Sequence, residues 1–157
     1  MHVQVRTSSG MFIMQTTPTI DTIRQRVSHI VHLPEENQEA IQILRYKPGQ
    51  FYRPHQDFFA DQTNIDRGGQ RTATVLMYLT DVEGGGETIF PNGGGQSECG
   101  GAMSTGFAVK PRKGDAVLFY SMTPSGKEDS SSIHGSCEVT KGEKWSATIW
   151  IRTGKFV

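Results

Sequence analysis

The sequence predicts a mainly β protein, a β-sandwich or a double-stranded β-helix (jelly roll), with one N-terminal helix packed on its outside. First, a single helical pattern near the start is followed by a series of short extended segments, as expected when a helix covers a sheet. Second, the chain contains 18 glycines, many of them clustered, which favours strands and turns over a helical bundle. Its 157 residues fit one domain, so we expect residues 1–157 to share one core.

The best helical pattern covers residues 18–33. Its apolar residues recur at spacings of three and four, as one face of an amphipathic helix requires: Ile20, Ile23, Val27 and Ile30. Pro18 fits an early helical position and Pro34 fits a helix stop. His29 and His32 have no carboxylate or cysteine at a spacing suited to metal binding. We therefore interpret both as solvent-facing or helix-end residues.

The chain after residue 38 alternates between extended runs and turns rich in Gly, Pro and Asp, which predicts short strands. We expect these strands at 41–46, 51–58, 72–79, 87–90, 116–120 and 144–151. Residues 61–69 and 122–132 read as polar loops. Residues 92–106 are mostly Gly, Ser and other polar residues, and we expect them to form a mobile loop.

The charge balance excludes some classes of partner. Lys plus Arg number 16 and Asp plus Glu number 16, so net charge gives no reason to expect nucleic acid or an anionic membrane as partner. We find no apolar run long enough for a membrane span and no signal segment at the start. The first residues read like the middle of a domain, so we expect the chain to be a processed form or part of a longer protein.

Two cysteines, Cys99 and Cys137, lie 38 positions apart. They permit one disulfide, which would indicate an oxidising compartment, or they are two unrelated thiols. They do not have the close spacing that zinc sites use, so a cysteine-based metal site is not expected.

The strongest candidate for chemistry is His55 with Asp57, followed far downstream by His134. In a strand, residues two apart point to the same face, so His55 and Asp57 are expected to project together while Gln56 points away. His134 would complete the set from a neighbouring strand. Two histidines and one carboxylate suit Fe(II) in a non-haem oxygenase, and zinc or manganese remain possible on ligand type alone.

The last expected strand divides into two faces. One face carries Lys144, Ser146, Thr148 and Trp150, and the other carries Trp145, Ala147, Ile149 and Ile151. Lysine is rarely buried unless it is paired, so Lys144 on an inward face would need an anion, such as a bound carboxylate. Alternatively, Lys144 is only a turn lysine at the start of a strand.

Four segments together resemble the catalytic domain of prolyl 4-hydroxylases, which are Fe(II)- and 2-oxoglutarate-dependent dioxygenases. These segments are 6–10, 46–57, 85–91 and 134–148. The resemblance extends over nearly the whole chain and is greatest to the plant and green-algal type. In that family, further residues usually precede the segment that matches 6–10. Arg152 stands where the family pattern often has histidine, a difference expected to alter the rim of the pocket.

The resemblance implies a role for each candidate residue. The metal ligands would be His55, Asp57 and His134. Lys144 would bind the distal carboxylate of 2-oxoglutarate, in a pocket shared with Tyr46, Thr88 and Trp150. Tyr52 and Arg71 would lie beside the bound proline, with the loops at 61–70 and 92–106 over the peptide. Cys99 and Cys137 match positions that such enzymes bridge by a disulfide.

The resemblance also implies an activity and its partners. The expected reaction is hydroxylation of peptidyl proline in proline-rich substrates (cell-wall glycoproteins or collagen-like proteins), using O2 and 2-oxoglutarate and releasing succinate and CO2. Ascorbate would keep the iron reduced, and the expected location is the endoplasmic reticulum lumen or secretory pathway. The alternatives are an inactive jelly-roll binding module and an oxygen-sensing prolyl hydroxylase. The second is disfavoured because that relative typically has arginine where Lys144 stands.

Overall fold

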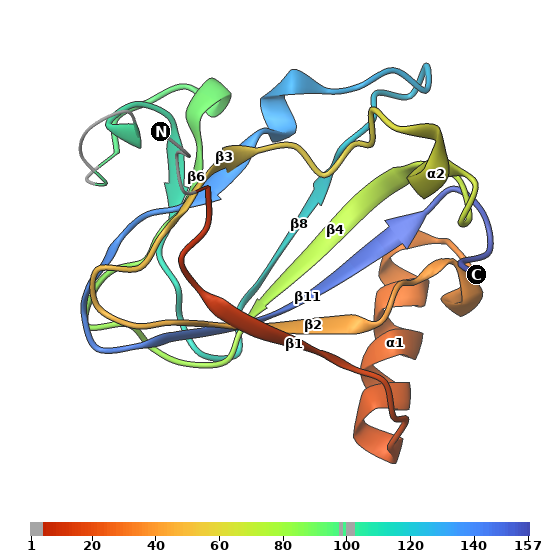
Figure 1. Cartoon of the computed structure of the whole chain (residues 1–157), viewed down its shortest axis with the longest axis horizontal. Coiled ribbons are helices and arrows are strands. Elements are labelled where there is room, and N and C mark those ends of the chain that lie inside the picture. Colours follow the sequence, from red (N-terminus) through yellow and green to blue (C-terminus); the bar gives the residue numbers. More distant parts are fainter. Residues whose placement is uncertain (1–4, 98, 100–102) are drawn as a thin grey trace.

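The computed structural model describes residues 5–97, 99 and 103–157, and its strands form two main antiparallel sheets (Figure 1). The larger sheet, in spatial order, contains β1 (Ser9–Ile13), β2 (Ile41–Tyr46), β11 (Lys144–Arg152), β4 (Arg71–Tyr78) and β8 (Ala116–Tyr120). The smaller sheet contains β3 (Tyr52–His55), β9 (His134–Ser136), β6 (Thr88–Phe90) and β7 (Phe107–Val109). A two-stranded ribbon joins β10 (Val139–Lys141) to β5 (Gly84–Gly85). The predicted mainly β jelly roll is confirmed.

Helix α1 (Pro18–Val31) confirms the predicted N-terminal helix. The Thr17 side chain caps its start by accepting a hydrogen bond from the Ile20 amide, and Pro18 occupies the first turn. His32 ends the helix in a left-handed conformation with φ 56°, and both His29 and His32 are exposed. Within the described part of the chain, no helix has the length and apolar character needed to cross a membrane.

The other helical segments that lie entirely within the described residues are single turns. They are η1 (Glu35–Asn37), α2 (Gln62–Ile65), η2 (Pro91–Gly93) and η4 (Ser130–Ser132). Two of them are capped by aspartate side chains. Asp61 accepts a hydrogen bond from the Asn64 amide, and Asp129 accepts one from the Ser131 amide. These side chains satisfy backbone donors that a helix of one turn leaves free.

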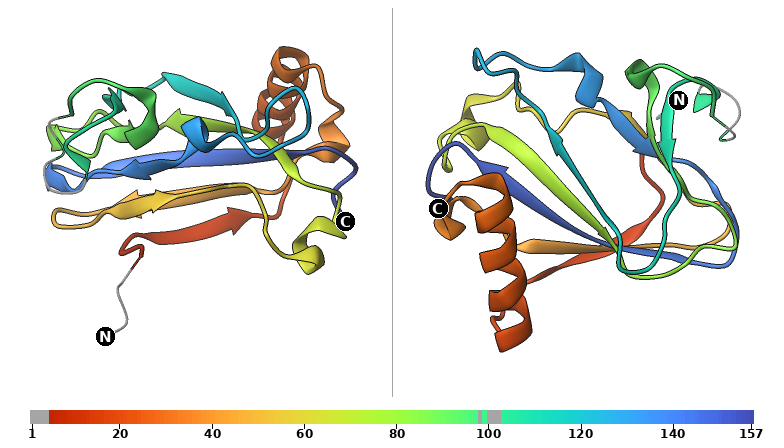
Figure 2. Two further views of the ribbon diagram at one scale, coloured as in Figure 1. Left: turned by 90° about the horizontal axis from the view of Figure 1, so that it is seen from above. Right: turned by 180° about the vertical axis from the view of Figure 1, so that it is seen from behind.

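The apolar core lies between α1 and the outer face of the larger sheet, where the helix runs across the strands (Figure 2). Its buried members are Val27, Val31, Ile41, Ala73, Val75, Ala147, Ile149 and Ile151. The opposite face of the same strands is largely polar and includes Gln42, Thr74, Ser146 and Thr148. The predicted division of strand β11 into an apolar and a polar face is therefore confirmed.

Several elements of the structure were not in the expected pattern, among them β1, β7 and α2. First, β1 was not predicted. It is an edge strand held only by β2, and Met11 and Phe12 are 64% and 46% exposed, so its sequence lacks a buried alternation. Second, β7 was missed within a run of glycine and polar residues; it pairs only with β6. Third, the short helix α2 forms inside the segment expected to be an irregular loop.

The expected strand 51–58 was wrong in its second half, because β3 ends at His55. Beyond that residue, hydrogen bonds to side chains replace strand pairing. The Phe59 amide donates to Gln70 Oε1 at 2.6 Å, and Asp57 accepts from Thr74.

The expected mobility of 92–106 falls partly outside the described residues. Its described parts contain the β-bridge between Gln96 and Thr105.

Candidate active site

One cavity of about 240 Å³ lies among residues of both sheets. Strand β11 supplies four alternate side chains to it: Lys144, Ser146, Thr148 and Trp150. Strands β2 and β4 supply their own polar faces, and the smaller sheet supplies the histidines. The cavity therefore occupies the space where a closed β-sandwich would carry its apolar core. Every candidate metal, co-substrate and peptide residue named from the sequence lines this cavity; the two cysteines do not.

The structure brings His55, Asp57 and His134 together. His55 and His134 are register partners on β3 and β9, although 79 positions separate them in the sequence. The His55 Nε2 atom lies 3.9 Å from Asp57 Oδ1, and the His134 Nε2 atom lies 3.8 Å from Asp57 Oδ2. One ligand atom from each residue falls within 4.8 Å of the others. This is the separation needed for three ligands around one ion.

Backbone carbonyls orient both imidazole rings. His55 Nδ1 lies 2.9 Å from the Arg53 carbonyl oxygen, and His134 Nδ1 lies 3.0 Å from the Ser132 carbonyl oxygen. Because a carbonyl only accepts, each Nδ1 must carry the proton, which leaves each Nε2 lone pair directed toward Asp57. Burial, followed by the neighbouring His134, lowers the pKa of His55 to about 4. His55 is therefore neutral near pH 7 and able to act as a ligand.

Asp57 is a buried carboxylate held in its charged form. Burial alone would raise its pKa, but His134, the Thr74 hydroxyl, His55 and Arg71 together lower it. Thr74 Oγ1 donates to Asp57 Oδ2 at 2.7 Å, and Arg71 Nη1 lies 4.0 Å from Asp57 Oδ1. Two imidazoles and one carboxylate, each oriented by a second group, fit the facial triad of a non-haem Fe(II) site.

At another part of the cavity, Lys144 is buried with 2% of its surface exposed. Its Nζ donates to the Gly86 carbonyl oxygen at 2.7 Å and to Ser136 Oγ at 2.9 Å. In the part of the chain that the structure describes, no carboxylate forms an ion pair with it. Burial therefore lowers the pKa of Lys144 to about 7, an effect that Glu87 partly opposes. A buried ammonium group whose hydrogen-bond partners are all neutral is suited to bind the carboxylate of a ligand.

Three hydroxyl side chains surround this cation or lie close to it. Tyr46 pairs with Lys144 in register, and the Lys144 Nζ lies 5.3 Å from the Tyr46 ring centroid. Tyr78 lies 5.6 Å from the same Nζ, and its hydroxyl donates to Thr88 Oγ1 at 2.7 Å. Burial raises the pKa of Tyr46 and of Tyr78 to about 12, so both keep their protons as hydrogen-bond donors. Tyr46 and Thr88 were expected here, whereas Tyr78 was not.

The structure groups Trp150 with Arg71, away from Lys144. Trp150 is six residues along β11 from Lys144, which corresponds to about 20 Å of strand. Its ring lies under the Arg71 guanidinium, with Arg71 Cζ 3.9 Å from the ring centroid. The resemblance implied that Trp150 lines the pocket that contains Lys144. Trp150 does line the same cavity, at the part that also contains Arg71, and its role stays a prediction.

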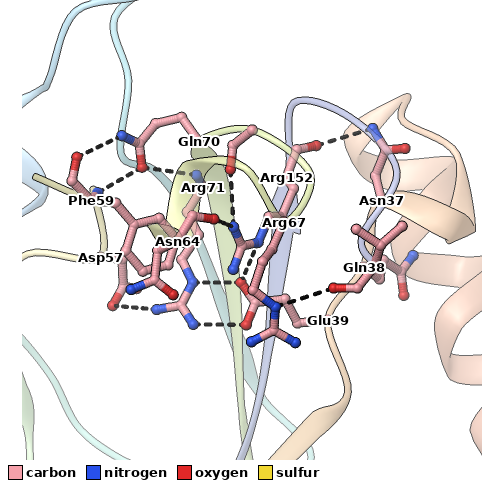
Figure 3. A network of polar contacts seen from close by, with 12 residues as sticks. Asn37, Gln38, Glu39, Asp57, Phe59, Asn64, Arg67, Gln70, Arg71 and Arg152 are labelled. Carbon is pink, nitrogen blue, oxygen red and sulfur yellow. Dashed lines mark hydrogen bonds and ion pairs between the residues drawn. The ribbon is translucent and has the colours of Figure 1, made fainter. Parts of the chain in front are cut away.

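Tyr52 and Arg71, the two residues expected beside a peptide, both lie close to the metal ligands. The Tyr52 ring stacks on His55, with centroids 3.7 Å apart and planes at 15°. Arg71 does not have a free guanidinium, because Glu39 binds it through two hydrogen bonds of 2.7 and 2.8 Å (Figure 3). Glu39 was missed from the sequence. Its only signal is an acidic residue two positions before an apolar strand, which is too weak to assign a role.

Cys99 and Cys137 lie at disulfide distance, with their Cα atoms 5.3 Å apart. Cys137 is buried and directly follows Ser136, the residue that accepts a hydrogen bond from Lys144. The pair thus lies beside the Lys144 part of the cavity.

Comparison with known proteins identifies the class. Residues 41–152 match the family model of the 2OG-Fe(II) oxygenase superfamily. Strands β2 to β11, the metal triad and the buried lysine all lie within this match, and the chain belongs to that superfamily.

Individual relatives narrow the class to prolyl hydroxylases. The chain is 57% identical over 152 residues to prolyl 4-hydroxylase 1 of Arabidopsis thaliana, covering 94% of this chain and 54% of that one. It is 50% identical to the probable prolyl 4-hydroxylase 7 of the same plant, covering 98% and 51%. A solved viral collagen prolyl hydroxylase from Paramecium bursaria chlorella virus-1, in its 2OG complex, is 30% identical with a TM-score of 0.74, covering 94% and 80%. The resemblance to prolyl 4-hydroxylases is confirmed, and the chain spans about half the length of the Arabidopsis relatives.

Proposed function

We propose that this chain is the catalytic domain of a prolyl 4-hydroxylase, which hydroxylates peptidyl proline with O2 and 2-oxoglutarate and releases succinate and CO2. The observation that carries the proposal is a single cavity containing both a triad of His55, Asp57 and His134 and a buried cation, Lys144, without a carboxylate partner among the described residues. The triad fits Fe(II), and Lys144 fits the distal carboxylate of a keto diacid. The similarity to prolyl 4-hydroxylases supplies the substrate class.

The residues of the chain supply positioning and charge. His55 is neutral near pH 7 and Asp57 stays ionised, and together with His134 they would hold the metal. With 2-oxoglutarate and O2 bound, Fe(II) supplies the oxidative decarboxylation coupled to hydroxylation. Lys144 would donate to the distal carboxylate of 2-oxoglutarate, and Tyr46 and Thr88 would flank it. Asp57, His134 and Lys144 are buried, and the limited access of water to them strengthens each of these contacts.

The peptide would enter beside Tyr52, Arg71 and Trp150. Tyr52 and Trp150 offer flat ring faces, and pyrrolidine rings of proline pack well on such surfaces. A proline-rich chain also enters a groove at low entropic cost, since its backbone is already restricted. We therefore expect proline-rich peptides, of cell-wall or collagen-like type, as substrates.

Three further parts of the proposal rest mainly on the family. Cys99 and Cys137 would form a disulfide, which their 5.3 Å Cα separation supports. Such a bridge suits the endoplasmic reticulum lumen or secretory pathway, where a tagged full-length protein should be found. Ascorbate would restore iron that is oxidised in turnovers without peptide.

The direct test measures succinate and hydroxyproline together. The chain, loaded with Fe(II), is incubated with 2-oxoglutarate and a panel of Ser-Pro, Ala-Pro and Pro-Pro-Gly peptides, and products are identified by mass spectrometry. We expect one hydroxyproline for each succinate in at least one peptide. His134→Ala should abolish both products. Lys144→Ala should raise the KM for 2-oxoglutarate about 10-fold or more, because a charge-assisted contact is lost.

The exposed lysine of the Lys141–Glu83 ion pair gives the matched control, Lys141→Ala, which should leave the KM for 2-oxoglutarate unchanged. Metal binding without succinate formation in any peptide would instead indicate a jelly-roll binding module. Undiminished succinate formation by His134→Ala would contradict the ligand assignment itself.

A further inference from the structure

Glu39 is a single buried carboxylate that binds two guanidinium groups (Figure 3). Its Oε1 atom accepts from Arg71 Nε at 2.7 Å and from Arg152 Nε at 2.8 Å, and its Oε2 atom accepts from Arg71 Nη2 at 2.8 Å. Only 7% of the Glu39 side chain is exposed. With Asp57 4.0 Å from Arg71, the cluster contains two carboxylates and two guanidinium groups, so its charges balance.

Arg152 lies behind the cavity wall and does not line the cavity. Its side chain is 1% exposed and lies between the Phe59 and Phe156 rings, at 4.6 and 5.1 Å from their centroids. Arg152 is therefore not itself part of the pocket rim, and the expectation that it alters the rim stays a prediction. Arg152 lies on the side of Glu39 that faces away from the cavity. Any effect of Arg152 on the shape of the cavity must therefore be transmitted by the residues that it contacts.

Arg152 also holds the backbone of the 61–70 segment. Its Nη1 donates to the carbonyl oxygens of Asn64 and Gly69, which lie near opposite ends of that segment. The end of the segment is tied to the wall a second time, because the Gln70 side chain exchanges two hydrogen bonds with the Phe59 backbone. Phe59 in turn packs against both guanidinium groups, at 4.7 Å from Arg71 and 4.6 Å from Arg152.

We propose that Arg152 is a positioning residue that fixes Arg71 and the 61–70 segment in one arrangement through Glu39. Arg152 acts through Arg71, and its effect on peptide binding rests on the proposed function. A guanidinium is required because three acceptors must be met from one buried side chain: Glu39 Oε1 and two carbonyl oxygens. A histidine ring has at most two N–H donors, and a lysine lacks the rigid fork.

The first test follows the side chains without any substrate. In the zinc-loaded protein, NMR measures how fast the Nε protons of Arg71 and Arg152 exchange with water. Arg152→Lys and Arg152→His should make the Arg71 Nε proton exchange about 10-fold faster or more, because Glu39 loses one of its two partners. Amides of the 61–70 segment should exchange faster in the same variants.

Arg67→Gln is the matched control. Arg67 belongs to the same segment and also lies over Phe156, at 5.0 Å, but it is exposed and does not contact Glu39. This change should leave the exchange rate of the Arg71 Nε proton unaltered.

If neither Arg152 variant folds, the wild-type chain still tests whether Arg152 positions Arg71. The Nε protons of Arg71 and Arg152 should then show the same denaturant dependence of exchange, and independent behaviour of the two protons would overturn the proposal.

The second test measures steady-state kinetics of peptide hydroxylation. Arg152→Lys should raise the KM for peptide about 10-fold while the KM for 2-oxoglutarate stays within about twofold of wild type. A merely structural role would raise both together, and that result would count against positioning. If the wild-type chain hydroxylates no peptide, the proposed function fails, whereas the exchange experiment still tests the link between Arg152 and Arg71.

Discussion

At the scale of single residues, the site depends on how each ligand is held. Asp57 has its Oδ2 bound by the Thr74 hydroxyl and its Oδ1 near Arg71, so its two oxygens are oriented before any metal arrives. Such outer contacts set ligand geometry and commonly decide metal affinity.

Thr74→Val should weaken metal binding while preserving the fold. Valine has nearly the same shape as threonine but cannot donate to Asp57 Oδ2, so the carboxylate loses its orientation. We expect the Kd for Co(II) or anaerobic Fe(II) to rise about 10- to 100-fold. Thr140→Val changes an exposed threonine on β10 and should leave the Kd unaltered. An unchanged Kd in Thr74→Val would show that Asp57 is oriented by other groups.

The sequence predicted the metal ligands and Lys144 but missed three residues that support the site: Thr74, Tyr78 and Glu39. His55, Asp57, His134 and Lys144 stand out because metal ligands and buried lysines are chemically rare patterns. Thr74 and Tyr78 look like ordinary strand residues, and only the register of β4 against its neighbours shows which groups they meet. Glu39 was missed for the same reason, since its partners lie 32 and 113 positions away.

At the scale of elements, the pairing of β3 with β9 assembles the metal site. The two strands bring His55 opposite His134, and the residue after His134 is Gly135. A Cβ atom at Gly135 would lie 2.8 Å from the Tyr52 carbonyl oxygen and 3.1 Å from the Pro54 nitrogen. Both atoms belong to the β3 backbone, so a side chain at this position forces the strands apart.

Gly135→Ala should therefore reduce metal binding strongly, because separation of β3 from β9 also separates His55 from His134. We expect at least about a 10-fold rise in the Kd for Co(II) by titration. Gly154→Ala is a suitable control, since a Cβ there comes no closer than 3.4 Å to the Gly68 carbonyl oxygen. Wild-type affinity in Gly135→Ala would mean that the strands tolerate the shift without moving the ligands.

Strand prediction was most reliable where one face is buried. Strands β2, β4 and β11 were predicted closely, because their apolar residues pack against α1 at every second position. Strands β1 and β7 were missed, since each pairs at a sheet edge with few buried side chains. The length of β3 was overestimated because its polar residues alternate beyond the point where pairing stops.

At the scale of the whole molecule, the buried Lys144 makes stability depend on pH. Its pKa is lowered from 10.5 to about 7 in the folded protein, whereas the unfolded chain keeps the ordinary value. Between these values the unfolded chain binds more protons than the folded one. The free energy of unfolding of the metal-free protein should therefore rise with pH from about 7 toward 10.5, by at most about 1.4 kcal/mol per pH unit from this group.

Urea denaturation of wild type and Lys144→Met checks this dependence. Because methionine does not titrate, the wild type should gain stability relative to the variant as pH rises from 7 to 9.5. The contributions of the other titrating groups are the same in both proteins, so they cancel in that difference. Lys141→Met removes an exposed lysine, and the difference between it and wild type should be flat over the same range. A flat difference for Lys144→Met would show that Lys144 keeps an ordinary pKa.

The separation of the apolar core from the catalytic cavity has a consequence for how such a protein can change. Along the nine residues of β11, side chains that stabilise the fold alternate with side chains that face the cavity. Ser146 and Thr148 can therefore accept substitutions that reshape the substrate pocket, while Ala147 and Ile149 on the other side keep the helix in place. A library randomised only at Ser146 and Thr148 should yield many folded proteins with new selectivity. One randomised at the intervening positions should yield mostly insoluble ones.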